Sequence, residues 1–279
     1  MVNHLLPETL EEALEALARK QHLLFAGGTD LMVQKRAWAG LPRNFEHPVL
    51  FTSRIAKLNF IEKRSDHLAV GATCSLEMML EYPDTPDLFK TIIGEMASPG
   101  IRNHATLAGN IANASPAGDT LVGLYLYDAT IVLKSLRGER LVPIADFITG
   151  VRKIDLAQDE MITEIRIPHQ DFTHIDYVKV GPRKADAISK IAFAGAAKTN
   201  DLTVSDIRAA FGAVFKTVLR SPATEAMLKG MRIADIKADL ASICEAYARL
   251  LQPIDDQRSN KEYRKAVAIN LLARFIKSL

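Results

Sequence analysis

Two adjacent glycines followed by a hydroxyl and a carboxyl side chain form the first candidate site. The run Gly27-Gly28-Thr29-Asp30 follows a short apolar stretch at 22–25, expected as a strand, and precedes a helical pattern that starts at Leu31. Paired glycines permit positive φ and close approach of a ligand, so their successive N–H groups can form a nest for a phosphate. The alternative is a tight strand-to-helix turn in which Asp30 caps the helix. The run contains neither a Walker lysine nor a G-x-G-x-x-G pattern, which excludes a P-loop and a Rossmann fingerprint.

The second candidate site is a loop predicted at 106–119, which is dense in small residues and in side chains that form hydrogen bonds. Its two asparagines, Thr106 and Ser115 can supply several hydrogen bonds to a polar ligand, and Asp119 can accept them from hydroxyl or ring N–H groups. The alternative is an ordered loop that closes on itself through Asx turns. Taken together, the two stretches are typical of two walls of a dinucleotide site.

Regular elements surround both stretches. Thr9 and Glu12 form a capping-box pattern before a helix, and Ser75 is placed to cap another helix. A polar stretch at 168–171 suggests a domain boundary, and the strands beyond it precede helices, which is typical of a separate α+β domain. Strands are predicted at 48–51, 67–72, 129–133, 162–167, 176–180, 191–197 and 207–214, and helices at 91–97, 233–251 and 259–278.

Composition limits the possible functions. The 279 residues carry 35 basic and 33 acidic side chains, a balance that gives no electrostatic reason to expect nucleic acid. Two cysteines, Cys74 and Cys244, cannot build a disulfide framework or the four-cysteine site of an iron–sulfur cluster. The scattered histidines favour no metal site, and no apolar run is long enough for a membrane span. A soluble, cytoplasmic protein is expected.

The motifs resemble those of a known family. AGGTDL at 26–31 and TLAGNIANASPAGD at 106–119 are similar to the two flavin-binding motifs of the FAD subunit of molybdenum hydroxylases. That family includes xanthine dehydrogenases, carbon monoxide dehydrogenase and related aldehyde and N-heterocycle oxidoreductases. The similarity extends through the stretches 159–168 and 177–190 to the pair Tyr263-Arg264. One departure is Ala108, where the family usually has glycine, and it is tolerable only if φ there is negative.

The resemblance implies an α+β chain with two domains. Residues 1–170 would form an FAD-binding domain of the PCMH-like type, with two subdomains at roughly 1–55 and 56–170 that sandwich the cofactor. Residues 173–279 would form a small C-terminal domain of sheet plus helices. FAD would be the cofactor of this chain, whereas molybdopterin and two [2Fe–2S] clusters would belong to a large and a small partner subunit. Electrons would pass from the clusters through FAD to NAD+ or another acceptor, with no catalytic side chain and no metal site in this chain.

The resemblance also implies a set of FAD-binding residues. The first motif would wrap the pyrophosphate, the second would hold the phosphates and the middle of the cofactor, and Asp119 would bind the ribityl or ring end. Ile162 and Lys179 would lie near the isoalloxazine or adenine, and the loop 183–190 would approach the flavin face. The full set is Ala26, Gly27, Gly28, Thr29, Asp30, Leu31, Thr106, Gly109, Asn110, Ser115, Asp119, Ile162 and Lys179.

Two other functions stay open at this stage. A stand-alone FAD-dependent oxidoreductase would need an acid–base pair beside the flavin, and the sequence shows no obvious pair. A flavin-free scaffold subunit would have no use for the paired glycines of the first motif or for Asp119 of the second.

Overall fold

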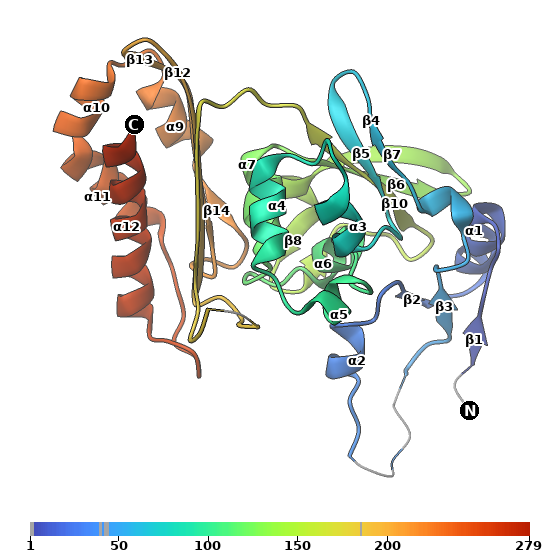
Figure 1. Ribbon diagram of the computed structural model, residues 1–279. Coiled ribbons are helices and arrows are strands. Elements are labelled where there is room, and N and C mark those ends of the chain that lie inside the picture. The colour runs from blue at the N-terminus through green and yellow to red at the C-terminus, as the bar shows by residue number, and fades with distance from the viewer. Residues whose placement is uncertain (1–2, 39–40, 42–44, 185) are drawn as a thin grey trace. The chain divides into compact units, whose positions relative to one another are not determined.

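The computed structural model describes residues 3–38, 41, 45–184 and 186–279 (Figure 1). Its contacts divide the chain into two compact units. Unit 1 comprises the residues up to Thr85, together with Ser98–Asn113 and Ala129–Pro168. Unit 2 comprises Pro86–Ala97, Ala114–Asp128 and His169–Leu279. Two segments that precede residue 170 therefore make their main contacts with the C-terminal part of the chain.

The first sheet of unit 1 is small and parallel. It contains β1 (His4–Leu5), β3 (Val49–Phe51) and β2 (Leu23–Phe25), in that order. The helix α1 (Leu10–Arg19) makes the crossover from β1 to β2, as parallel pairing requires. The predicted capping box is confirmed, because the backbone N–H of Glu12 donates to Thr9 Oγ1 over 3.2 Å and the Glu12 carboxylate accepts from Thr9 N.

The second sheet of unit 1 has five antiparallel strands around the buried strand β10. Its order is β4-β5-β10-β6-β7, and the predicted strands at 67–72, 129–133 and 162–167 are its three inner members. The edge strands β4 and β7 were not predicted, because their charged residues interrupt the apolar pattern. The bounds are β4 Ile61–Lys63, β5 His67–Gly71, β6 Thr130–Ser135, β7 Gly138–Pro143 and β10 Met161–Pro168.

Short elements complete unit 1. Ser75 caps α3 as predicted, since its hydroxyl accepts from the N–H of Met78 over 3.1 Å. The other elements are α2 (Leu31–Gln34), η1 (Ala56–Leu58), α3 (Leu76–Glu81), α5 (Pro99–Arg102), α6 (Leu107–Asn113), α8 (Ile144–Phe147), β8 (Ile148–Gly150) and β9 (Lys153–Ile154).

Unit 2 is built on a four-stranded antiparallel sheet in the order β11-β12-β13-β14. Helix α12 packs closely on one face, where a Cβ at Gly195 would lie 2.8 Å from the ring of Phe275. Helix α7 packs on the other face, where Gly212 lies against Val122 (Figure 1). The strands are β11 (His174–Val180), β12 (Ile191–Asn200), β13 (Thr203–Gly212) and β14 (Leu219–Arg220). The helices are α4 (Asp87–Gly94), α7 (Asp119–Leu126), α9 (Pro222–Leu228), α10 (Ile233–Ala238), α11 (Leu240–Leu250) and α12 (Lys261–Ser278).

Two helix predictions in unit 2 need correction. The helix expected at 91–97 begins earlier, as α4, because Pro86 at the N-cap position sets its start and the apolar residues of its first turn are buried. The stretch 233–251 forms two helices that meet at Asp239, whose φ and ψ are not helical.

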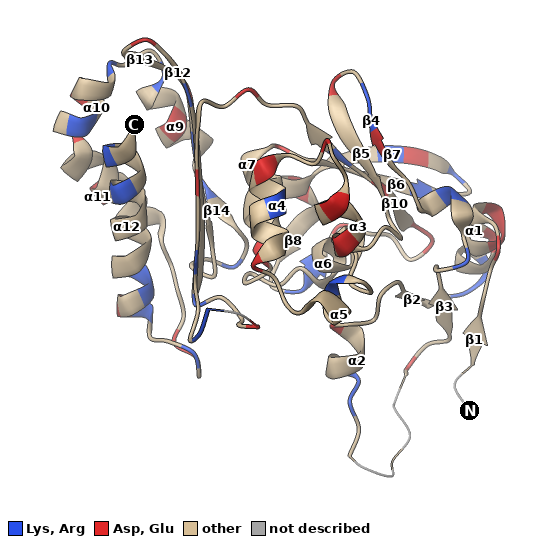
Figure 2. Ribbon diagram, viewed as in Figure 1, with Lys and Arg blue, Asp and Glu red and all other residues tan. Residues whose placement is uncertain are grey.

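Acidic and basic residues are interspersed along the described chain (Figure 2). In the same described residues, no helix is both long and apolar enough to cross a bilayer.

Candidate functional site

The loop between β2 and α2 presents a row of backbone donors. Gly28 has a φ of +72°, and its carbonyl accepts from the N–H of Met32 over 2.9 Å. In the part of the chain that the structure describes, no group accepts from the N–H of Gly27, Gly28, Thr29 or Asp30. Consecutive N–H groups without acceptors at the start of a helix are suited to an anion such as a pyrophosphate.

Asp30 does not cap α2 through its side chain. The residue occupies the N-cap position, but its φ and ψ are helical and its carboxylate makes no cap hydrogen bond. The alternative expectation of an Asp30-capped turn was therefore wrong, because side-chain capping requires an extended backbone at that position. The neighbouring donors remain available to a ligand.

Gly27 packs against the His104–Ala105 peptide, directly before the second motif, within unit 1. A Cβ built at Gly27 would lie 1.8 Å from the carbonyl oxygen of His104, so no side chain fits there. Farther along, the Gln34 amide donates to Asn113 Oδ1 over 2.8 Å, which ties the end of α2 to the end of α6. The sequence suggested that Gly27 lets a ligand approach, and the structure shows in addition that it lets the first motif pack against the peptide that precedes the second.

Most of the second motif is helical, which corrects the expectation of a loop. Thr106 precedes α6, and its hydroxyl accepts from the N–H of Gly109 over 2.9 Å. Glycine and asparagine are weak helix formers, so the local pattern concealed a helix that burial and this cap stabilise. Ala108 lies inside α6 without a positive φ, so its methyl group is tolerated.

The predicted binding residues divide between the two units. Unit 1 contains the first motif together with Thr106, Gly109, Asn110 and Ile162, and unit 2 contains Ser115, Asp119 and Lys179. Thr106 and Asn110 are buried polar side chains in unit 1. Ile162 is also buried, and it lies beside the irregularity where β10 shifts register against β6. In unit 2, Ser115 Oγ accepts from the N–H of Ala117 over 3.3 Å, which shows that part of the motif does close on itself.

A buried charged cluster at the start of α7 is the main polar feature of unit 2. Lys179 Nζ lies 2.7 Å from Asp119 Oδ2, and the Ser189 hydroxyl donates to Asp119 Oδ1 over 2.5 Å. Lys179 also donates to the backbone carbonyl of Glu95 over 3.1 Å. The side chains of Lys179 and Asp119 are only 6% and 9% exposed, so this ion pair is largely removed from water. Asp119 also lies in the first turn of α7, where the helix dipole favours a negative charge.

Ser189 was not predicted as a site residue, although the loop 183–190 was expected near the flavin. It is 1% exposed and follows a loop in which the Arg183 guanidinium donates to the carbonyl of Asp186. Position 185 of that loop lies outside the described residues. No local pattern marks Ser189, because its importance comes from a carboxylate 70 residues earlier in the chain.

Replacing Ser189 by alanine is expected to lower the free energy of unfolding by about 2 kcal/mol, because the lost hydrogen bond ends on a charged group. Urea unfolding of the full chain measures this change. Ser205→Ala is the control, since Ser205 is exposed and donates only to the carbonyl of Lys198. Equal effects of the two substitutions would show that the Ser189–Asp119 hydrogen bond contributes no more to the free energy of unfolding than an exposed one.

Metal binding and thiol chemistry are the other functions considered for the described residues. Among the described residues, no group of three or more His, Cys, Asp and Glu side chains could hold a metal ion. Burial raises the pKa of the Cys74 thiol, which donates to the carbonyl of Phe60, as expected for a buried and unreactive cysteine.

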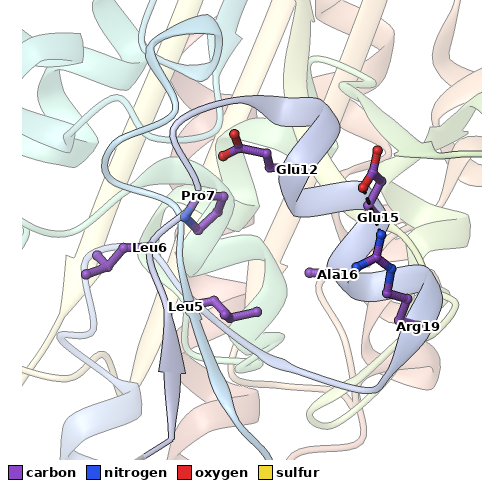
Figure 3. Close-up of a pocket in the computed structure, with 7 residues that line it drawn as sticks. All are labelled: Leu5, Leu6, Pro7, Glu12, Glu15, Ala16 and Arg19. Atoms are coloured by element: carbon purple, nitrogen blue, oxygen red, sulfur yellow. Dashed lines mark hydrogen bonds and ion pairs between the residues drawn. The ribbon is translucent and has the colours of Figure 1, made fainter.

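A surface hollow lies elsewhere on unit 1, beside α1. Leu5, Leu6 and Pro7 form part of its lining, and the ion pair of Arg19 with Glu15 forms another part (Figure 3). None of the predicted binding residues contributes to this hollow, so it is separate from the candidate site.

Comparison with known proteins gives matches along both halves of the chain. Residues 1–170 match the family described as the FAD binding domain in molybdopterin dehydrogenase. Residues 176–279 match the CO dehydrogenase flavoprotein C-terminal domain. These two matches together span nearly the whole sequence.

Individual relatives are also subunits of dehydrogenases. The xanthine dehydrogenase FAD-binding subunit of Escherichia coli O157:H7 is 29% identical, over 92% of this chain and 88% of its own length. The nicotinate dehydrogenase FAD-subunit of Eubacterium barkeri is 31% identical, over 71% of this chain and 69% of its own. A chain of the carbon monoxide dehydrogenase structure from Hydrogenophaga pseudoflava superposes with a TM-score of 0.89 at 25% identity, covering 99% of this chain and 96% of its own.

Proposed function

The chain belongs to the FAD-binding medium subunits of the molybdenum hydroxylase family, and on that premise we propose that it is an electron-transfer subunit. Its FAD receives electrons from the [2Fe–2S] clusters of a small partner subunit and delivers them to NAD+ or another acceptor. A large partner subunit with molybdopterin carries out the hydroxylation. The observation that carries this proposal is the match of both domains, from residue 1 to 170 and from 176 to 279, to flavoprotein subunits of this kind.

The residues of the chain fit the cofactor. The four backbone N–H groups of Gly27 to Asp30 have no acceptor among the described residues, so they would hold the FAD pyrophosphate. A carboxylate offers about four lone-pair sites, so Asp119 can accept from a ribityl hydroxyl or a ring N–H in addition to its two present donors. Bound FAD would supply the redox chemistry, and the chain would supply position and electrostatics.

The remaining predicted residues enter the proposal in the same way. Thr106, Gly109, Asn110 and Ser115 would hold the middle of the cofactor, and Ile162 would border the isoalloxazine. Residues 1–170, with subdomains near 1–55 and 56–170, would form the FAD domain, and 173–279 the C-terminal domain. We place the assembly in the reducing cytoplasm, in keeping with the free thiols of Cys74 and Cys244.

The substrate is assigned to the large subunit. The relatives are named for xanthine, nicotinate and carbon monoxide, which differ in size and chemistry, although the matching chains resemble this one along most of its length. This chain is therefore expected to set the electron acceptor and not the substrate.

Rapid anaerobic mixing tests the electron route. The FAD-loaded chain is mixed with its chemically reduced [2Fe–2S] partner subunit, and the flavin band near ~450 nm is followed. We expect the band to bleach, and to return when NAD+ or another acceptor is added. Bleaching by a small substrate without either partner would support a stand-alone oxidoreductase and contradict the proposal. A chain that stays colourless even when it is co-expressed with both partners would indicate a flavin-free scaffold.

A further inference from the structure

Tyr177 on β11 has a buried hydroxyl group that the fold leaves without a partner. Its oxygen is inaccessible to solvent and forms no hydrogen bond with any described residue. Most buried side-chain polar groups in native proteins are hydrogen-bonded, because an unsatisfied one loses its hydration without compensation. Such a group therefore indicates either a local loss of stability or a bound ligand that accepts its hydrogen bond.

The hydroxyl lies beside the Asp119 cluster of unit 2. Tyr177 and Lys179 are two residues apart on one strand, so they project from the same face of the sheet. They pair in register with Ala194 and Ala192 of β12, and Ala192 contacts the position of Gly212 on the face that packs α7. Two small neighbours on β12 leave room for the long side chains of β11 on this face.

The electrostatic surroundings identify the hydroxyl as a donor. Burial, and then the nearby carboxylates of Asp119 and Glu95, raise the pKa of Tyr177 well above its ordinary value. The phenol therefore keeps its proton at neutral pH.

The charged cluster itself does not use this donor. The Asp119 carboxylate accepts from Lys179 and Ser189, and Lys179 additionally donates to the carbonyl of Glu95. Tyr177 is thus next to a fully connected network without belonging to it. No described residue accepts its proton, which leaves a bound ligand as the candidate acceptor.

We propose that Tyr177 donates its hydroxyl hydrogen to an acceptor at the flavin end of bound FAD, and so is a further binding residue of the site. This inference rests on the proposed role of Asp119 and Lys179 at that end of the cofactor. Both the isoalloxazine carbonyls and the ribityl oxygens of FAD offer suitable acceptors.

Tyr177→Phe in the full chain tests the inference through two effects of opposite sign. Without FAD, the variant is expected to melt about 2–4 °C higher than the wild type, because an unsatisfied buried hydroxyl has been removed. With FAD, it is expected to bind the cofactor about five- to tenfold more weakly, because one hydrogen bond is lost. A bond to the ring would also shift the visible absorption maxima, whereas a bond to the ribityl chain would leave them in place.

Tyr127→Phe is the matched control. Tyr127 is buried in unit 2 and packs edge-on against Phe89 and Phe172. It follows the C-terminal residue of α7, whereas Asp119 is the first residue of that helix. Its substitution should leave FAD affinity unchanged. FAD affinity of Tyr177→Phe equal to that of the wild type would overturn the inference while leaving the proposed function intact. Loss of FAD from the wild type itself, even within the complex, would instead overturn the proposed function.

Discussion

Replacing Gly27 by valine is expected to abolish retention of FAD and to lower the free energy of unfolding by about 3 kcal/mol, the upper end of the usual cost of overpacking. The physical reason is the 1.8 Å that would separate a Cβ at Gly27 from the carbonyl oxygen of His104. Backbone cannot move aside as a flexible side chain can. The loop has to move away from the His104–Ala105 peptide, which displaces the four N–H donors from Gly27 to Asp30.

The flavin-to-protein absorbance ratio after desalting measures the first effect, and denaturant unfolding measures the second. Gly100→Ala is the control in the same unit, because Gly100 lies in α5 and a Cβ there would meet nothing within 4 Å. Alanine at this position should leave the stability unchanged or raise it slightly, since alanine has a higher helix propensity than glycine. Wild-type FAD content in Gly27→Val would show that contact with the His104 peptide does not shape the site.

The second large effect concerns the buried pair of Asp119 and Lys179. Asp119→Ala is expected to destabilise the chain by about 3 kcal/mol, because the Lys179 ammonium would keep only the carbonyl of Glu95 as a partner. Lys179→Met should cost a similar amount by leaving the carboxylate with only the Ser189 hydroxyl. Both variants should also lose FAD, since Asp119 is proposed to hold the ribityl or ring end.

A double variant separates the structural role of the pair from its binding role. Asp119→Asn combined with Lys179→Met removes both charges and keeps an acceptor for Ser189. Its free energy of unfolding should return to within about 1 kcal/mol of the wild type, because neither charge remains buried alone. Its affinity for FAD should stay at least about tenfold lower, since a carboxylate accepts more strongly than an amide. Full recovery of FAD binding would mean that the pair only stabilises unit 2.

Several features of the site could be predicted from short stretches of sequence. The strand, glycine turn and helix around Gly28 follow from an apolar run, two residues without side chains and a resumed helical pattern. The capping box at Thr9 follows from two residue types at a fixed spacing. The family resemblance added the expected FAD-binding side chains, including Asp119 and Lys179, which the structure places 2.7 Å apart.

Other features could not be predicted in this way. The helix α6 was mistaken for a loop, because Gly109 and Asn110 have weak helix propensity and the stabilising burial comes from distant residues. The edge strands β4 and β7 were missed because an edge strand facing water has no need of an apolar pattern.

The sequence by itself determined some local conformations, such as the glycine turn and the capping box, and the chemical groups available: adjacent backbone N–H donors, hydroxyl side chains and the Asp119 carboxylate. Only the tertiary structure decided which groups meet. Asp119 forms an ion pair with Lys179, 60 residues later, and accepts a hydrogen bond from Ser189, 70 residues later. Gly27 packs against the backbone carbonyl of His104. Those contacts depend on how strands and helices pack, and a hydrogen-bond partner so far along the chain leaves no trace in local periodicity. The same packing leaves the donors of the first loop and the hydroxyl of Tyr177 without acceptors among the described residues, and these are the groups that a cofactor can complete.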